Sequence, residues 1–114
     1  MIKIMAADFR SEYAGVTPPD ASPAFFTYMD KAGHRMRKLD ASIRTDTFSV
    51  LAQNWRKWSE AHDKAMAEQS HRPEDLKDFL SMIERMRDQM TDQLVESALE
   101  QQKAADKADK TLGR

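Results

Sequence analysis

Apolar residues recur at helical spacing in three stretches of the chain, and turn signals divide these stretches. In the first stretch the apolar positions follow steps of three and four residues, which place side chains on one face of an α-helix: Phe25, Met29, Ala32, Met36, Leu39 and Ile43. Ser22 and Pro23 are typical of a helix start, since serine caps free amides and proline is tolerated at the first helical position. We therefore expect one helix over about 23–43. Gly33 is where it would bend or divide, because glycine costs ~1 kcal/mol relative to alanine inside a helix.

The second stretch follows a cap signal at Thr45-Asp46. Its apolar face carries Phe48, Leu51, Ala52, Trp55, Ser59, His62 and Met66, with Trp58 and Ala65 on the flank. We expect this helix to end near Gln69, because Pro73 disfavours helix in the residue before it.

The third stretch begins at Pro73, with Glu74 and Asp75 in its first turn, where carboxylates suit the positive end of the helix dipole. Its main stripe is Leu76, Phe79, Leu80, Ile83, Met86, Met90, Leu94 and Ala98. A helix to about residue 105 would span ~50 Å at 1.5 Å per residue. The polar residues after it are expected to fray.

Three amphipathic helices with short connections predict an all-α fold. The expected architecture is an up-down-up three-helix bundle or an extended helical hairpin with a long C-terminal helix. We expect an N-terminal arm at 1–22 with a short extended piece near its start, a helical domain at 23–105 and a frayed polar tail at 106–114.

Composition favours a reducing compartment for this domain. The chain has 114 residues, of which 40% are hydrophobic and 32% charged, and it contains no cysteine. Disulfides and thiolate chemistry are therefore excluded. No apolar run approaches the roughly 20 residues that span a bilayer, so we expect a cytoplasmic protein that does not bind membranes.

Motifs for catalysis or for a cofactor are missing from the sequence. It has no glycine-rich phosphate loop, no Gly-x-Ser-x-Gly turn and no His-Glu-x-x-His. Glu68 and His71 have the spacing of two metal ligands on one helix face, but a di-iron bundle needs a second such pair and two further glutamates. We therefore expect no enzyme activity, no cofactor and no metal.

Four residues are candidates for contact with a partner protein. Val95 and Leu99 lie about 100–140° from the main stripe of the third helix, so they form a second apolar strip. Either the N-terminal arm covers this strip or a partner does. Trp58 lies at the edge of the second stripe, and Met82 adds apolar contact. The first hypothesis is a helical adaptor, chaperone or inhibitor that binds another protein and forms a homodimer.

Basic residues concentrate in the first half of the chain and support an alternative hypothesis. Seven basic residues stand against two acidic ones between Lys31 and Lys57, although the net charge of the chain is −1. A nucleic-acid-binding accessory protein would use the basic side chains Arg35, Arg37, Lys38, Arg44, Arg56 and Lys57. Such binding requires that several of them converge on one face.

Overall fold

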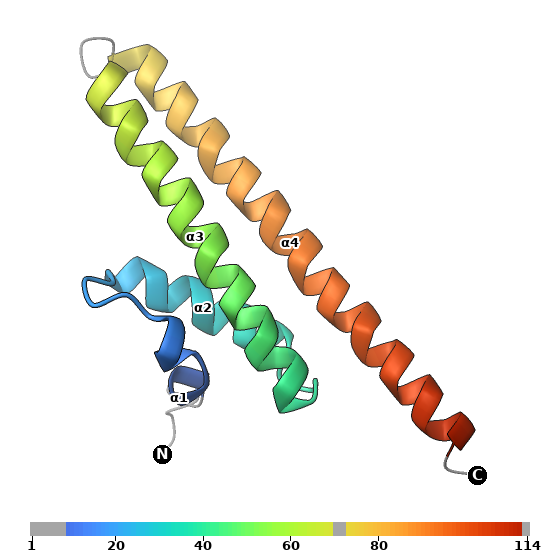
Figure 1. Cartoon of the computed structure of the whole chain (residues 1–114). Coiled ribbons are helices and arrows are strands. Elements are labelled where there is room, and N and C mark those ends of the chain that lie inside the picture. The colour runs from blue at the N-terminus through green and yellow to red at the C-terminus, as the bar shows by residue number, and fades with distance from the viewer. Residues whose placement is uncertain (1–8, 70–72, 113–114) are drawn as a thin grey trace, which may run out of the picture.

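The computed structural model describes residues 9–69 and 73–112 (Figure 1). Two long helices, α3 (Ala41–Gln69) and α4 (Pro73–Leu112), run antiparallel as a hairpin. Three shorter helical elements precede them: α1 (Arg10–Tyr13), the 3-10 turn η2 (Ala14–Val16) and α2 (Pro23–Arg35). The described ranges contain no strand, and the prediction of an all-α protein is confirmed.

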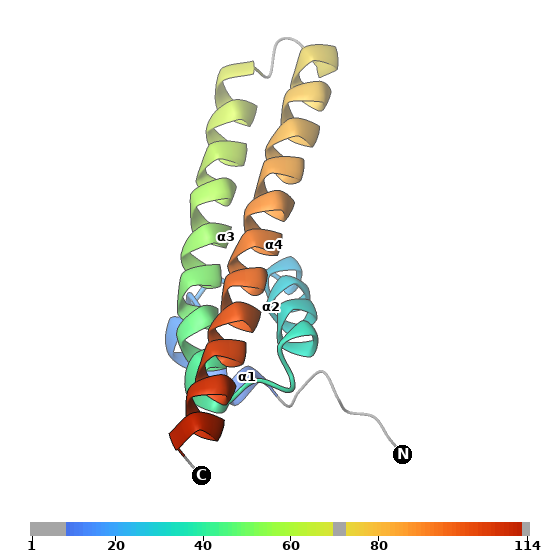
Figure 2. The same cartoon turned by 90° about the vertical axis from the view of Figure 1, so that its right-hand side faces the viewer.

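The three short elements cover only one part of the hairpin. Figure 2 shows α2 lying along one side of α3 and α4 near the C-terminal end of α4, while the hairpin continues well beyond it. The described part of the molecule is accordingly elongated, with extents of 65 × 33 × 24 Å. The part in which α1, η2 and α2 cover the hairpin is called the base below. The part farthest from it, residues 64–69 of α3 and 73–82 of α4, is called the outer end.

Aromatic side chains fill the core of the base. The ring of Tyr13 meets the ring of Phe48 edge-on at 5.2 Å and that of Phe25 at 6.2 Å, and Phe25 meets Trp55 at 6.1 Å. Edge-to-face packing at such distances adds about 0.5–1.5 kcal/mol per pair to the effect of burial. These contacts join α1, α2 and α3 into one core.

The N-terminal segment belongs to this core from Phe9 onward. Phe9 and Tyr13 are buried, and the Tyr13 hydroxyl donates a hydrogen bond of 2.7 Å to Asp30 in α2. Phe9 packs directly on Gly33, where an added Cβ would lie only 2.8 Å from its Cδ2. Gly33 is therefore the residue that lets this ring approach α2. The extended piece expected near the start of the arm lies outside the described residues.

The first long helix of the prediction is wrong beyond Arg35. Helix α2 ends there, and the amide of Met36 donates to the carbonyls of Ala32 and Gly33. The chain then turns, and Arg44 donates to the carbonyl of Leu39 at 2.7 Å. Met36 and Leu39 are nevertheless buried. The apolar spacing therefore reflects a shared core and not a continuous helix.

Two further boundaries differ from the prediction. Helix α3 begins at Ala41, so Thr45 lies inside it, and the amide of Arg44 donates to the carbonyl of Asp40 in its first turn. Helix α4 begins at Pro73 as predicted but continues to Leu112, beyond the expected end near residue 105.

Candidate functional site

A buried polar cluster ties α2, α3 and α4 together and sets the register of the hairpin. The side-chain amide of Asn54 donates to the hydroxyl of Tyr28 at 2.9 Å and to that of Thr91 at 3.2 Å. The Thr91 hydroxyl donates to the carbonyl of Arg87 at 2.7 Å, so its one hydrogen is already used. The Tyr28 hydroxyl must therefore be the donor in its 2.9 Å contact with Thr91. Burial raises the pKa of Tyr28, although its hydrogen bonds to Thr91 and Asn54 oppose the increase.

The same cluster positions Trp58. Its indole N–H donates to the side-chain oxygen of Asn54 at 2.8 Å, and the ammonium of Lys57 lies 5.1 Å from its ring centre. Trp58 is half-buried, so it is held by the fold and only partly available to a partner.

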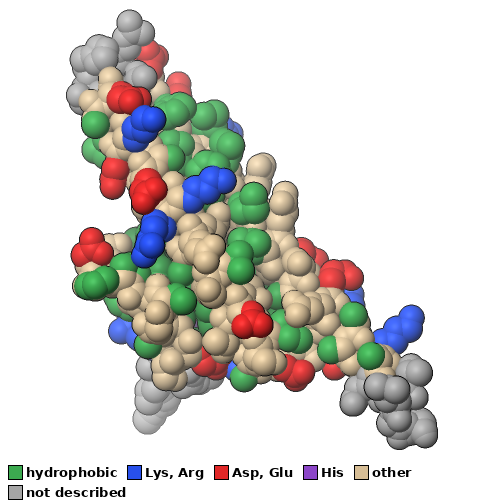
Figure 3. Space-filling model, in the orientation of Figure 1, with side chains coloured by type: hydrophobic (Ala, Val, Ile, Leu, Met, Phe, Trp, Pro, Cys, Tyr) green, Lys and Arg blue, Asp and Glu red, His purple; other side chains and the backbone are tan. Residues whose placement is uncertain are grey.

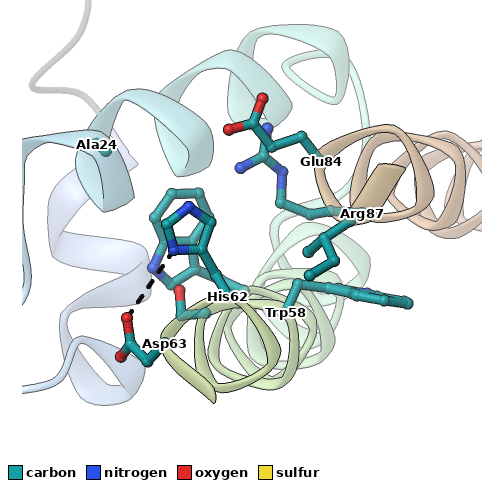
Figure 4. A pocket seen from close by; sticks show the side chains of 9 residues that line it. Ala24, Trp58, His62, Asp63, Glu84 and Arg87 are labelled. Carbon is teal, nitrogen blue, oxygen red and sulfur yellow. Dashed lines mark ion pairs between the residues drawn. The ribbon is translucent and has the colours of Figure 1, made fainter. Parts of the chain in front are cut away.

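Trp58 also lines a cavity between α2, α3 and α4 (Figure 4). The cavity has a volume of about 270 Å³, and its walls are Ala24, Trp55, Trp58, Ser59, His62, Asp63, Ile83, Glu84 and Arg87. Arg87 is hydrogen-bonded to Asp88 and lies 5.3 Å from the Trp55 ring, and His62 lies 4.0 Å from Asp63. Within the described ranges, no three His, Asp or Glu side chains are placed to hold a metal ion.

The largest exposed apolar side chains of α4 lie on the side away from α2. Phe79, Met82 and Met86 are 41%, 38% and 42% exposed. At about 100° per residue, Met82 is about 180° around the helix from Thr91, which faces α2, and the other two are within about 60° of Met82. Phe79 and Met86 belong to the predicted main stripe of this helix, but they are not buried. A two-helix contact buries only a narrow seam, and here Leu76, Leu80 and Ile83 occupy it.

This apolar surface continues toward the base along the groove between α3 and α4. Val50 of α3 is 43% exposed and lines a hollow there together with Leu94. Figure 3 views the side of the hairpin opposite α2, and hydrophobic side chains gather on it, bordered along α3 by acidic and basic ones. The surface is called the front apolar face below, and its members are Val50, Phe79, Met82, Met86 and the half-buried Met90 and Leu94.

The second apolar strip predicted at Val95 and Leu99 is not a free surface. Val95 is fully buried, and Leu99 is half-buried against the core. Val95 follows Thr91 by one turn, so it points between α3 and α2 in the base. The expectation that these two residues are exposed is therefore wrong. Of the four predicted contact residues, Met82 is exposed and Trp58 is half-buried.

The six basic residues of the alternative hypothesis are not gathered on one face. The Arg44 guanidinium is mostly buried and forms two hydrogen bonds of 2.8 Å with Glu12, which raise its pKa. Arg35 pairs with Asp92 at 2.9 Å, and Arg37 donates to the carbonyl of His34. Like Arg35 and Arg37, the other three are exposed: Lys38 in the turn before α3, Lys57 beside Trp58, and Arg56 at a hollow shared with the acidic Asp20, Glu60 and Asp63.

Sequence reasoning missed Phe9, Tyr13 and Asn54. An arm of 22 residues that carries two aromatic side chains was a signal that it packs on the core. Asn54 had no comparable signal, because a single amide inside a helix is usually solvated. The excess of apolar positions at the start of α4 could have indicated an exposed face, since one neighbouring helix cannot cover them all.

No family model, no curated protein and no solved structure matches the chain. No helix in the described ranges is both long enough and apolar enough to cross a membrane.

Proposed function

We propose that the protein is a helical interaction module that binds a partner protein through the front apolar face. The observation that carries this proposal is the row of Phe79, Met82 and Met86, three large apolar side chains in about two turns of α4, each about 40% exposed. Methionine suits such a surface because its flexible, polarizable side chain adapts to the shape of a partner. Adaptor, chaperone and inhibitor are the forms that this role can take, and the absence of cysteines favours the cytoplasm as its location.

The free energy available from this row sets the size of the contact. Full burial of a phenylalanine or methionine side chain contributes about 1.5–3 kcal/mol. Because each of the three is already more than half covered, covering the remainder contributes about 1 kcal/mol per residue. About 3 kcal/mol does not offset the entropy lost on association. We therefore expect the partner to extend along the groove as far as Leu94 and Val50.

The proposal is tested by replacing Met82 with a photo-reactive benzophenone amino acid and irradiating cells of the native host. The matched control carries the same amino acid in place of Lys103, an exposed residue near the end of α4. We expect protein adducts from position 82, few from position 103, and loss of the adducts when Met86 is also changed to lysine. Equal labelling from the two positions, or no adduct from position 82, would refute the proposed function.

A further inference from the structure

We propose that the partner on the front apolar face is a second copy of this chain, which packs hairpin against hairpin into a four-helix bundle. This inference rests on the proposed function, because it names the partner of the same face. Two hairpins that meet on their front faces bury both apolar rows at once, since a two-fold axis places the same patch on each side of the interface.

The proposed two-fold axis is parallel to the length of the hairpins. About such an axis, α3 of each copy lies beside α4 of the other, and every pair of neighbouring helices is antiparallel. This is the arrangement of an up-down four-helix bundle. Helix α2 lies on the opposite side of each hairpin, whereas α1 and η2 pack against α3 and reach its far edge from α2 (Figure 2).

The register of the contact follows from the buried polar cluster. Asn54 and Thr91 are hydrogen-bonded across the hairpin, so they lie at one height, and residues of α3 and α4 whose numbers sum to about 145 share a height. An axis parallel to the hairpin keeps these heights. Glu60 of one copy is therefore level with Arg85 of the other, and Lys64 lies within one turn of Asp78.

The angular positions of these four charged residues also fit the contact. At about 100° per residue, Lys64 lies within about 40° of Val50, and Glu60, one turn before Lys64, lies about 80° from Val50, between the front apolar face and the hollow that it shares with Asp20. Asp78 and Arg85 lie within about 60° of Met82, at the outer edge of the front apolar face. All four side chains are exposed.

Charge complementarity selects the second copy over an unrelated partner. Along the seam between the copies, an acidic residue of α3 meets a basic residue of α4, and a basic residue of α3 meets an acidic one: Glu60 with Arg85, and Lys64 with Asp78. The two-fold axis repeats both pairs. No ion pair within residues 9–69 and 73–112 uses any of the four, so they are available across the seam.

Sedimentation equilibrium of the whole protein tests the inference, with a dimer of twice 13.1 kDa expected. Changing Glu60→Arg places like charges at the seam, and we expect the dimer to dissociate about tenfold more readily. The double change Glu60→Arg with Arg85→Glu restores the opposite charges and should recover the dimer. All of these positions are exposed, so the variants are expected to fold, and circular dichroism checks that they do.

Cysteine cross-linking tests the register directly, because the chain has no cysteine of its own. The variant Glu60→Cys with Arg85→Cys should form a disulfide between chains on oxidation. Within one chain these residues point away from each other across the hairpin. The single variants Glu60→Cys and Arg85→Cys are the controls and should remain uncross-linked. The inference is overturned if Glu60→Arg leaves the dissociation of the dimer unchanged. It is also overturned if the single cysteine variants cross-link as much as the double variant.

Failure of this inference is distinguishable from failure of the proposed function. A protein that stays monomeric at high concentration overturns the second copy as partner, whereas photo-adducts from position 82 with a different protein keep the proposed function. Adducts of twice the chain mass support both.

Discussion

Replacing Asn54 with alanine tests the buried polar cluster, which holds three helices in register. The change removes the three hydrogen bonds of Asn54, with Tyr28, Thr91 and Trp58, of 2.9, 3.2 and 2.8 Å. The hydrogen bond from Tyr28 to Thr91 survives, so only the indole N–H of Trp58 loses its sole partner. Trp58 is half-buried, so water reaches this group in part.

The hydrogen bonds lost and retained set the expected decrease in the free energy of unfolding. Each net hydrogen bond contributes about 0.5–1.5 kcal/mol, and a buried donor left without a partner costs about 1–3 kcal/mol. With one bond of the network retained and one donor partly hydrated, we expect Asn54→Ala to lower the free energy of unfolding by about 2–3 kcal/mol. Thr91→Val should cost less, about 1–2 kcal/mol, because it leaves the bond between Asn54 and Trp58 in place.

The assay is urea unfolding followed by tryptophan fluorescence, with both single variants and the double variant. Since Asn54 and Thr91 share a hydrogen bond, the double variant should lose at least 0.5 kcal/mol less than the sum of the single losses, as is typical of residues in one network. A loss below about 0.5 kcal/mol for Asn54→Ala, or strict additivity, would show that the three side chains do not act as a unit. The same variant should also weaken the proposed dimer, because its register depends on this cluster.

Two further outcomes are expected from the base. Gly33→Ala should lower the free energy of unfolding by about 1 kcal/mol, because a Cβ 2.8 Å from the Phe9 ring forces that ring outward, and this cost outweighs the helix preference of alanine. Thermal unfolding should show that Gly33→Ala causes no such loss in a protein that also carries Phe9→Ala. A loss that persists in that background would contradict the argument. Burial and the hydrogen bond to Asp30 raise the pKa of Tyr13 to about 12, from 10.0 in the unfolded chain. The neutral phenol is therefore favoured in the fold, so a contribution of about 2–3 kcal/mol is present below pH 10 and lost as the pH rises toward 12. Urea unfolding at pH 9 and pH 12 should show a smaller decline for Tyr13→Phe than for the wild type, and an equal decline would refute the assignment.

The helix starts at proline were predictable from the sequence. The end of α2 was not, because it depends on a contact with a residue several positions later in the chain. Pro23 and Pro73 begin α2 and α4 as expected. The turn after Arg35 was missed because its apolar residues keep helical spacing while Arg44, several residues later, binds its carbonyl groups. Helix α1 was missed because four residues are too few to show a period.

The candidate site was predictable only in part because the neighbours of α4 change along its length. At the outer end it faces α3 alone, so its contact seam is narrow and Met82 is exposed. In the base it faces α2 as well, and the buried side rotates toward Thr91 and Val95. The sequence pattern was interpreted as one continuous buried face along the whole helix. Because the buried side in fact rotates in the base, Val95 was wrongly assigned to the surface.

The uneven thickness of the hairpin has a consequence for its motion. The outer end consists of two helices with few buried side chains, whereas the base is closed by an aromatic core. Local opening requires less free energy where less apolar area is buried, so backbone amides of the outer end should exchange with solvent sooner than those of the base. A molecule bound at the outer end would slow the exchange of these amides. Hydrogen exchange of the two helices would therefore report whether the surface is bound.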